Sequence, residues 1–335
     1  PRGTVKSLRL HAYEYAYVKT RSDHNWHGIQ SGWDIKRMLG TVPVEEDGSV
    51  IFKAPANTPI SIQPLDKDGV AIQWMRSWVT GQPGEVVSCI GCHEDQNQIA
   101  IPKRVIASQK APSALTLPEG GTRSFTFDLE VQPILDRACI ACHNGEGKAF
   151  DLRGGKKDKL GYGTSYLNLH PYVHRQGGEG DMVVLQPYEY HPNTSELVRL
   201  LKKGHHNVKL TDKEWKTLYN WIDYNAPDKG YFNANVLTDL PYKGFDQIKR
   251  RKELTDKYAN GAGVDWKKEI ADYADYLKKQ GPITPVMPEK AAPVKEKTLK
   301  VKGWPFGADR IKEMLAKEKE TRKVVEIAPG VKVNF

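Results

Sequence analysis

The chain has 335 residues, 39% of them hydrophobic, and a formal net charge of +9 at pH 7. This composition supports ordinary hydrophobic cores and excludes an intrinsically disordered chain. No apolar run approaches the roughly 18 residues of a membrane-spanning helix, and no basic run carries a nucleic-acid-binding motif, so we expect neither a transmembrane segment nor a nucleic-acid partner.

Residues 1–98 are predicted to form a β-rich domain. Between Arg37 and Trp74, short apolar runs alternate with Glu-Asp-Gly, Pro-Ala-Asn and Asp-Lys-Asp-Gly, which are typical turn sequences. This pattern predicts an antiparallel β-sandwich-like part that ends in the first of two cysteine motifs. Residues 99–127 follow, and their content of Pro, Ser, Gln and Gly predicts a linker.

Residues 128–230 are predicted to form a mainly α-helical domain, which makes the whole chain α+β. Val131, Ile134 and Leu135 stand at helical spacing and predict a helix that leads into the second cysteine motif, with Pro133 in its first turn. Beyond this domain, residues 231–335 are predicted to be a charged helical extension. Its lysines either form a solvated helix surface or dock an acidic partner, such as a redox protein steered by charge.

The clearest single helix is predicted after residue 210. Thr211 and Glu214 have the spacing of a capping box, and Pro227 marks the end of the helix. One stripe of this helix is apolar, formed by Trp215, Leu218, Trp221 and Ile222. Such a stripe is usually plain core, and here that core can also include the face of a porphyrin.

All four cysteines of the chain lie in two Cys-x-x-Cys-His motifs, one formed by Cys89, Cys92 and His93 and the other by Cys139, Cys142 and His143. Cysteines at this spacing form thioethers with the two vinyl groups of one haem, and the adjacent histidine then ligates the iron. We therefore predict two covalently bound c-type haems. Covalent haem attachment takes place outside the cytoplasm, so we expect a periplasmic or otherwise extracytoplasmic protein.

Three other uses of the cysteines compete with haem. A four-cysteine zinc site usually separates its pairs by about 15–20 residues, whereas 46 residues lie between Cys92 and Cys139, and zinc does not explain both histidines. A thioredoxin-like redox pair requires a βαβ context that the sequence lacks. Two disulfides are compatible with an oxidising compartment, although Cys-x-x-Cys bridges are usually redox-active rather than structural.

The second axial ligand decides what each haem can do, because two protein ligands favour electron transfer and an open position allows substrate binding. For the second haem we predict His205 as the distal ligand and His206 as the next choice, since both precede the capped helix. The other candidates are His170, His174, His191 and Met182. For the first haem His93 is the proximal ligand, and the candidates for its partner are His11, His24, His27 and Met75, between which the sequence does not choose.

Several stretches of the chain resemble the hydrazine synthase alpha-subunit family. They are VPVEEDGSVIFKAPANTPISIQPLD, MRSW and PGEVVSCIGCHE in the first part, and LNLHPYV, EYHPNTSELVRLLKKGHHNVKL and WIDYNAP in the second. They occur in the family's order across residues 5–260. The resemblance implies a β-rich part that carries the first haem and a helical cytochrome c domain whose haem is held by two histidines.

The resemblance carries over unequally to the two sites. Cys139, Cys142 and His143 match the family's second haem site, with the distal histidine in the Gly-His-His stretch. At the family's first haem, a tyrosine four residues after the motif's histidine ligates iron and that histidine binds zinc. Asn97 stands at the tyrosine's position in this chain, so the tyrosine ligand does not carry over.

These observations favour a dihaem c-type cytochrome that transfers electrons, within a larger complex or for an attached enzyme. The expected partners are redox proteins or subunits, including acidic ones. The alternative is a haem enzyme of the hydrazine synthase alpha type that acts on small nitrogen compounds at the first haem. The sequence does not decide whether the chain is an enzyme, and it identifies no catalytic residue.

Overall fold

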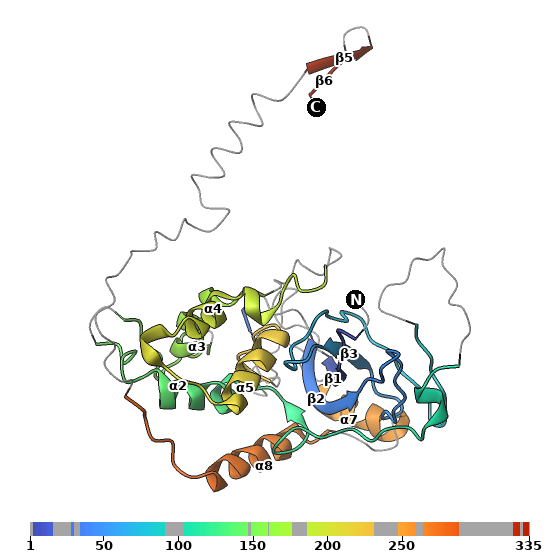
Figure 1. Cartoon of the computed structure of the whole chain (residues 1–335), viewed down its shortest axis with the longest axis horizontal. Helices are drawn as coiled ribbons and strands as arrows, with labels where there is room; N and C mark the ends of the chain where they lie inside the picture. Colours follow the sequence, from blue (N-terminus) through green and yellow to red (C-terminus); the bar gives the residue numbers. More distant parts are fainter. Residues whose placement is uncertain are drawn as a thin grey trace. The chain divides into compact units, whose positions relative to one another are not determined.

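The computed structural model describes residues 3–15, 28–29, 34–90, 104–146, 149–159, 161–175, 186–230, 247–258, 264–287, 324–328 and 331–334. The chain divides into two compact units, Pro1–Lys290 and Ala291–Phe335 (Figure 1). No helix in the described part of the chain is long and apolar enough to cross a membrane. The first unit contains both a β-sheet and a group of helices, which confirms the α+β class.

The first unit is built on a four-stranded antiparallel sheet with strand order β3-β1-β2-β4. Its strands are β1 (Ser7–Tyr15), β2 (Asp34–Pro43), β3 (Ile60–Leu65) and β4 (Arg123–Ser124). Successive side chains of a strand point to opposite faces of the sheet. In β1, therefore, Leu10 and Ala12 lie on one face, whereas Arg9 and His11 lie on the other.

The sandwich-like arrangement predicted for residues 1–98 is corrected by the structure. Leu10, Ala12 and Ile60 pack under a layer of irregular segments that contributes Val50, Phe52, Val79 and Leu115. Among the described residues these segments form only isolated bridges, such as Phe52 with Ser113, and no second sheet. The Pro-Ala-Asn-Thr-Pro sequence beside Phe52 explains this result, because proline cannot donate to a strand ladder.

The predicted linker 99–127 also needs correction in the part that the structure describes. Residues 107–109 form the short 3-10 helix η1 (Ala107–Gln109), and Thr116 pairs with Thr41 of β2. Further along, β4 pairs with Arg37 and Met38. This segment belongs to the fold because β2 would otherwise expose an unpaired edge there.

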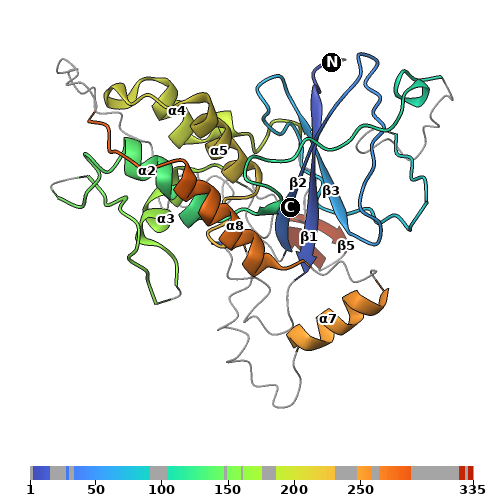
Figure 2. The ribbon, with the colours of Figure 1, turned by 90° about the horizontal axis from the view of Figure 1, so that it is seen from below.

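The helical part of the first unit lies beside the sheet (Figure 2). Its α-helices are α1 (Phe127–Glu130), α2 (Gln132–Ala138), α3 (Thr164–Leu169), α4 (Glu196–Lys202) and α5 (Asp212–Asp223). Short 3-10 turns connect them: η2 (His170–Tyr172), η4 (Pro192–Thr194) and η5 (His205–Asn207). The helices surround an aromatic core in which the Trp221 ring lies 5.3 Å from Phe127 and 6.3 Å from Tyr166, measured between ring centroids.

Helix α5 confirms the prediction made for it. Thr211 accepts the Glu214 backbone N–H, and Glu214 reaches back to the backbone of Thr211, so the capping box is complete. Leu218, Trp221 and Ile222 are buried in the common core, and Trp215 packs at its margin. The Trp221 indole donates to the carbonyl of Pro227 at 3.0 Å, which closes the segment after the helix.

Helix α8 (Trp266–Lys279) packs on the first unit, although the sequence placed it in a solvated extension. Arg37 of β2 forms an ion pair with Glu269. The Arg123 guanidinium lies 3.5 Å from the centroid of the Tyr273 ring, and Tyr273 donates to Glu130 at 2.8 Å. These contacts attach α8 to the edge of the sheet, where β4 lies.

The predicted extension 231–335 is therefore not uniformly helical. Helix α7 (Gln247–Tyr258) and α8 belong to the first unit. The second unit contains an antiparallel hairpin of β5 (Val324–Ala328) and β6 (Val331–Asn334). In the sequence, Pro-Gly stands between the two strands, and this dipeptide is typical of turns.

Candidate functional site

The second cysteine motif begins where α2 ends. Pro133 lies in the first turn of α2, as predicted, and Cys139 is the residue that ends the helix. The backbone N–H groups of Cys142 and His143 both donate to the carbonyl of Cys139, at 3.1 and 2.9 Å. The motif therefore forms one tight turn, which brings both sulfur atoms and the imidazole to the end of the same helix.

The ring of His143 is held by one hydrogen bond. Its Nδ1 lies 3.1 Å from the carbonyl oxygen of Phe150, which can only accept, so Nδ1 carries the proton. The Phe150 ring packs against the imidazole with centroids 4.7 Å apart, and the Tyr172 ring stacks on Phe150. This hydrogen bond leaves Nε2 as the free lone-pair donor, which is the usual arrangement of a metal-ligating histidine.

His205 reaches the same place from a different part of the chain. It follows α4 in a turn where Gly204, His206 and Asn207 all have positive φ, of 88°, 43° and 59°. Within that turn His205 is half-buried and His206 is exposed. The ring centroids of His143 and His205 lie 6.2 Å apart, with 39° between the ring planes.

This spacing fits two imidazoles that share one iron. A metal–nitrogen bond is about 2 Å and the nitrogen lies about 1 Å from the ring centroid, so two opposed imidazoles place their centroids roughly 6 Å apart. Burial, together with the nearby rings of His206 and His143, lowers the pKa of His205. A lowered pKa keeps the imidazole neutral at pH 7, which is the form that ligates metals. The geometry favours His205 over His206, in agreement with the sequence, and the axial pair stays a prediction.

The cysteines of this motif suit thioether formation. Burial raises the pKa of the Cys139 thiol to about 12, so the site disfavours a thiolate, whereas a thioether carries no charge. Cys142 is exposed, and both sulfurs are free rather than joined in a disulfide. Among the described residues, no group of three or more His, Cys, Asp and Glu side chains converges on a point that could hold a metal ion.

Three other candidate ligands of the second haem are engaged elsewhere. The Nε2 of His170 accepts from Arg175 at 2.7 Å, and Nδ1 of His174 pairs with the Thr194 hydroxyl at 2.8 Å. His191 is buried and accepts the Asn193 backbone N–H through Nδ1 at 3.2 Å. In His170 and His191 a ring lone pair accepts a hydrogen bond, which competes with metal ligation, whereas the bond at Nδ1 of His174 leaves its Nε2 outside that contact.

The first motif is only partly described. Cys89 is exposed, as is the neighbouring Ile90, 60% of whose surface is accessible. His11, a candidate ligand there, is instead fully buried and packs edge-on against Tyr224 with centroids 4.7 Å apart. The contacts of Met75, another candidate, are made by its backbone carbonyl, which accepts hydrogen bonds from the hydroxyl groups of Tyr13 and Ser61. The remaining candidates lie outside the described residues: Cys92, His93, His24, His27 and Met182.

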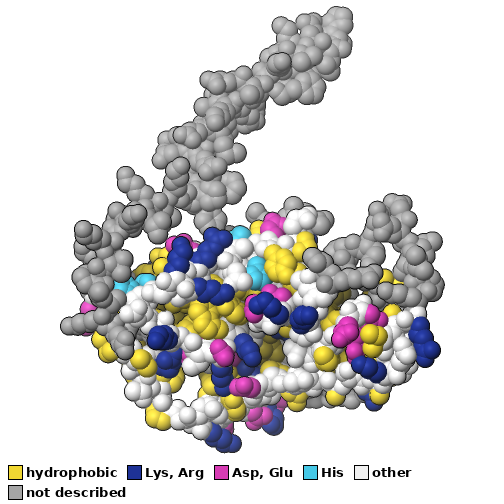
Figure 3. Space-filling model, viewed as in Figure 1, with side chains coloured by type: hydrophobic (Ala, Val, Ile, Leu, Met, Phe, Trp, Pro, Cys, Tyr) yellow, Lys and Arg dark blue, Asp and Glu magenta, His cyan; other side chains and the backbone are white. Residues whose placement is uncertain are grey.

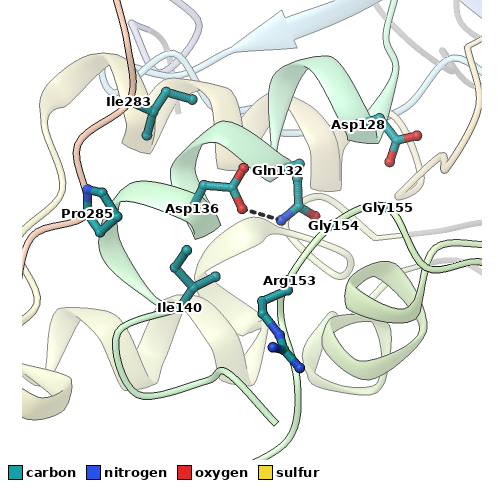
Figure 4. Close-up of a pocket in the computed structure, with 9 residues that line it drawn as sticks. All are labelled: Asp128, Gln132, Asp136, Ile140, Arg153, Gly154, Gly155, Ile283 and Pro285. Carbon is teal, nitrogen blue, oxygen red and sulfur yellow. Dashed lines mark hydrogen bonds between the residues drawn. The ribbon is translucent and has the colours of Figure 1, made fainter.

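Sequence reasoning missed Phe150 and Tyr172, whose rings line the proximal side of the site. Phe150 lies in a loop and Tyr172 at the end of the short η2 turn, and only their aromatic character could have drawn attention to them. It also missed a pocket of about 580 Å³ beside α2, into which Asp136, Gln132 and Ile140 project (Figure 4). Gln132 donates to Asp136 at 2.7 Å and to the Leu152 carbonyl at 2.9 Å, so it ties α2 to the following loop.

Comparison with known proteins bears on the sheet and the first motif. Residues 3–94 match the family model described as the hydrazine synthase alpha subunit middle domain, and this range includes Cys89, Cys92 and His93. Among solved structures, Kuenenia stuttgartiensis hydrazine synthase is similar at 18% sequence identity and a TM-score of 0.42, covering 69% of this chain. The present chain spans 40% of the length of that structure. No curated protein matches the chain.

The family match confirms the resemblance expected from the sequence over the part of the chain that holds strands β1, β2 and β3. The second cysteine motif lies outside the matched range. Residues 3–94 of this chain are thus similar to the middle domain of the hydrazine synthase alpha subunit.

Proposed function

We propose that this chain is a dihaem c-type cytochrome that transfers electrons as part of a larger complex or a multidomain protein. The observation that carries the proposal is the placement of His143 and His205 with their ring centroids 6.2 Å apart at the end of the helix that bears Cys139. Two histidines at this distance could both ligate one iron, and an iron with two protein ligands favours electron transfer over substrate binding.

At the second site each residue has a definite role. Cys139 and Cys142 would hold the haem covalently, with His143 as the proximal and His205 as the distal ligand. A haem held in this way supplies one-electron exchange between ferric and ferrous iron. The Phe150 carbonyl fixes the tautomer of His143 through the 3.1 Å hydrogen bond, and so raises the basicity of the ligating nitrogen.

The surroundings of the site support a rigid electron carrier. Tyr166, Trp221 and Phe127 are fully buried in the helical core. The Tyr166 hydroxyl donates to the Ala226 carbonyl at 2.9 Å and accepts the Ile29 backbone N–H at 3.0 Å, so the core has fixed polar contacts as well as packing. A scaffold of this kind changes little when the charge of a bound group changes.

The proposal includes an extracytoplasmic location, because c-type haem is attached outside the cytoplasm. Partner subunits are also expected, since the family matched by residues 3–94 is named for one subunit of hydrazine synthase. Both statements rest on haem attachment and on family likeness. They fail together with the haem proposal if neither cysteine motif carries a porphyrin.

A second candidate function is catalysis on small nitrogen compounds at the first haem. It is favoured by the family match, whose range includes Cys89, Cys92 and His93. Asn97, at the position of the family's tyrosine ligand, separates this chain from hydrazine synthase itself. A first haem with an open axial position would respond to nitric oxide or hydroxylamine by a shift of its optical spectrum, whereas a first haem with two protein ligands would not.

The proposal is tested by the spin state of the second haem. In His205→Ala the low-spin spectrum of one haem should become high-spin, because an axial ligand is lost, and His206→Ala is the matched control that should leave the spectrum unchanged. Electron paramagnetic resonance and optical spectra of the whole chain measure the spin state in both variants. If the two variants and the parent protein give the same spectrum, His205 is not the ligand and the assignment is wrong.

A further inference from the structure

The segment of the chain that contains His205 is densely cationic. Between residues 196 and 216 the chain carries six Lys and Arg residues against three Asp and Glu residues. The cations are Arg199, Lys202, Lys203, Lys209, Lys213 and Lys216, and all six are exposed. Figure 3 shows Lys and Arg side chains gathered over α4, which precedes His205 in the chain. We call these six exposed residues the His205 surface.

The acidic residues of this segment cancel only part of its charge, because six cations against three anions leave a net charge of +3. Glu214 forms an ion pair with Arg137 and also closes the capping box with Thr211, so its carboxylate is already occupied. Lys213 is paired with Glu119 at 2.7 Å. Lys203 and Lys209, which stand on either side of His205 in the chain, have no acidic partner in the part of the chain that the structure describes.

The His205 surface also offers an apolar contact. Leu200 is 40% exposed between Arg199 and Lys202. The Lys202 ammonium lies over the rings of Trp215 and Tyr219, at 6.0 and 5.5 Å from their centroids. Transient protein–protein interfaces combine apolar contacts with polar, charged ones, and the exposed Leu200 and the six cations offer both kinds.

We propose that the His205 surface is the docking site for a small acidic redox protein that exchanges one electron with the second haem. The inference rests on the function proposed above and names the surface and the partner's chemistry. When the partner acts as the donor, its reduced centre loses one electron and the ferric iron gains it. No proton is transferred, and no bond forms or breaks. Opposite charges on the two surfaces would speed their encounter and orient the partner over the half-buried His205.

The matched variants are Lys203→Glu with Lys209→Glu, and Lys6→Glu with Lys53→Glu. Both pairs change the net charge equally, and all four lysines are exposed. Lys6 and Lys53 lie in the β-rich part, at the start of the chain and beside Phe52. An acidic flavodoxin serves as the partner, and both its binding to the full haem-loaded chain and its rate of electron transfer are measured.

For the parent protein, both binding and rate should fall at least tenfold as ionic strength rises from about 10 to about 500 mM, because salt screens exposed charges. Lys203→Glu with Lys209→Glu should weaken binding and slow transfer about tenfold at low salt and remove most of the salt dependence. Lys6→Glu with Lys53→Glu should stay within twofold of the parent. Equal behaviour of the two variants would overturn the docking site.

A control separates this inference from the proposed function. Dithionite should reduce the low-spin haem to the same extent in all three proteins, and if no low-spin haem is present the proposed function itself fails. Vesicles that contain phosphatidylserine test an anionic membrane in place of a protein. If the charge change at Lys203 and Lys209 abolishes vesicle binding and leaves the flavodoxin rate untouched, the surface binds membranes and the acidic-protein partner is wrong.

Discussion

Arg9 of β1 and Asp223 at the end of α5 form a buried ion pair across 214 positions of sequence, with 2.9 Å between Nη1 and Oδ2. The two side chains are 8% and 0% exposed. Arg9 also donates to Gln63 at 3.1 Å and to Asn220 at 2.6 Å. These bonds attach the sheet to the helix whose first turn follows the candidate ligand His205.

Replacement of Arg9 alone should therefore be costly. In Arg9→Met the Asp223 carboxylate stays buried without its cation, and removal of one partner from such a pair costs about 3–5 kcal/mol. The double variant Arg9→Met with Asp223→Leu should recover most of that loss, since it leaves no unpaired charge. Urea denaturation followed by circular dichroism measures all three proteins. A single variant as stable as the parent would show that the pair contributes nothing.

The partly buried His170 should make the fold sensitive to mild acid. Burial, and secondarily the Arg175 guanidinium, lowers the pKa of His170 to about 3. Its unfolded pKa is about 6.5, so between these values the unfolded chain binds a proton that the folded chain does not. Stability should fall as pH drops through this window, by at most about 1.4 kcal/mol per pH unit. His170→Gln keeps an acceptor for Arg175 and should flatten the slope between pH 7 and 5; equal slopes in the two proteins would refute the role of His170.

Loss of the second cysteine pair should remove one covalent haem and weaken the helical part. In Cys139→Ala with Cys142→Ala the space between His143 and His205 loses its filling group, so packing there is lost. Hydrogen exchange should become faster in α2 and α5, and thermal melting should begin several degrees lower. Cys89→Ala with Cys92→Ala removes the other haem and should leave exchange in α5 unchanged. Unaltered melting after the first change would contradict the packing argument.

The capping box of α5 should contribute a measurable share of stability. Thr211→Ala removes the side-chain oxygen that accepts the Glu214 N–H, and such a loss costs about 1 kcal/mol. Thr211→Ser keeps the oxygen and should remain within a few tenths of a kcal/mol of the parent. Urea midpoints of the two variants provide the comparison. If serine costs as much as alanine, the hydroxyl is not what stabilises the helix start.

Local signals predicted the parts of the structure that depend on neighbouring residues. Pro133, Thr211 and Glu214 mark the beginnings of their helices because capping acts over three or four residues. The proximity of His205 to the second motif followed only from its place before a capped helix. Contacts between distant segments left no such trace, so β4, the Arg9–Asp223 pair and the docking of α8 were not predicted.

The buried polar face of β1 shows how a family boundary can differ from a physical one. Similarity to the matched family ends at residue 94, but the compact unit runs to Lys290. A fragment cut at residue 94 would open Arg9 and His11 to water and leave β2 without β4. The range matched by the family is thus shorter than the compact unit. Transfer of that range to another scaffold would require a substitute for the end of α5.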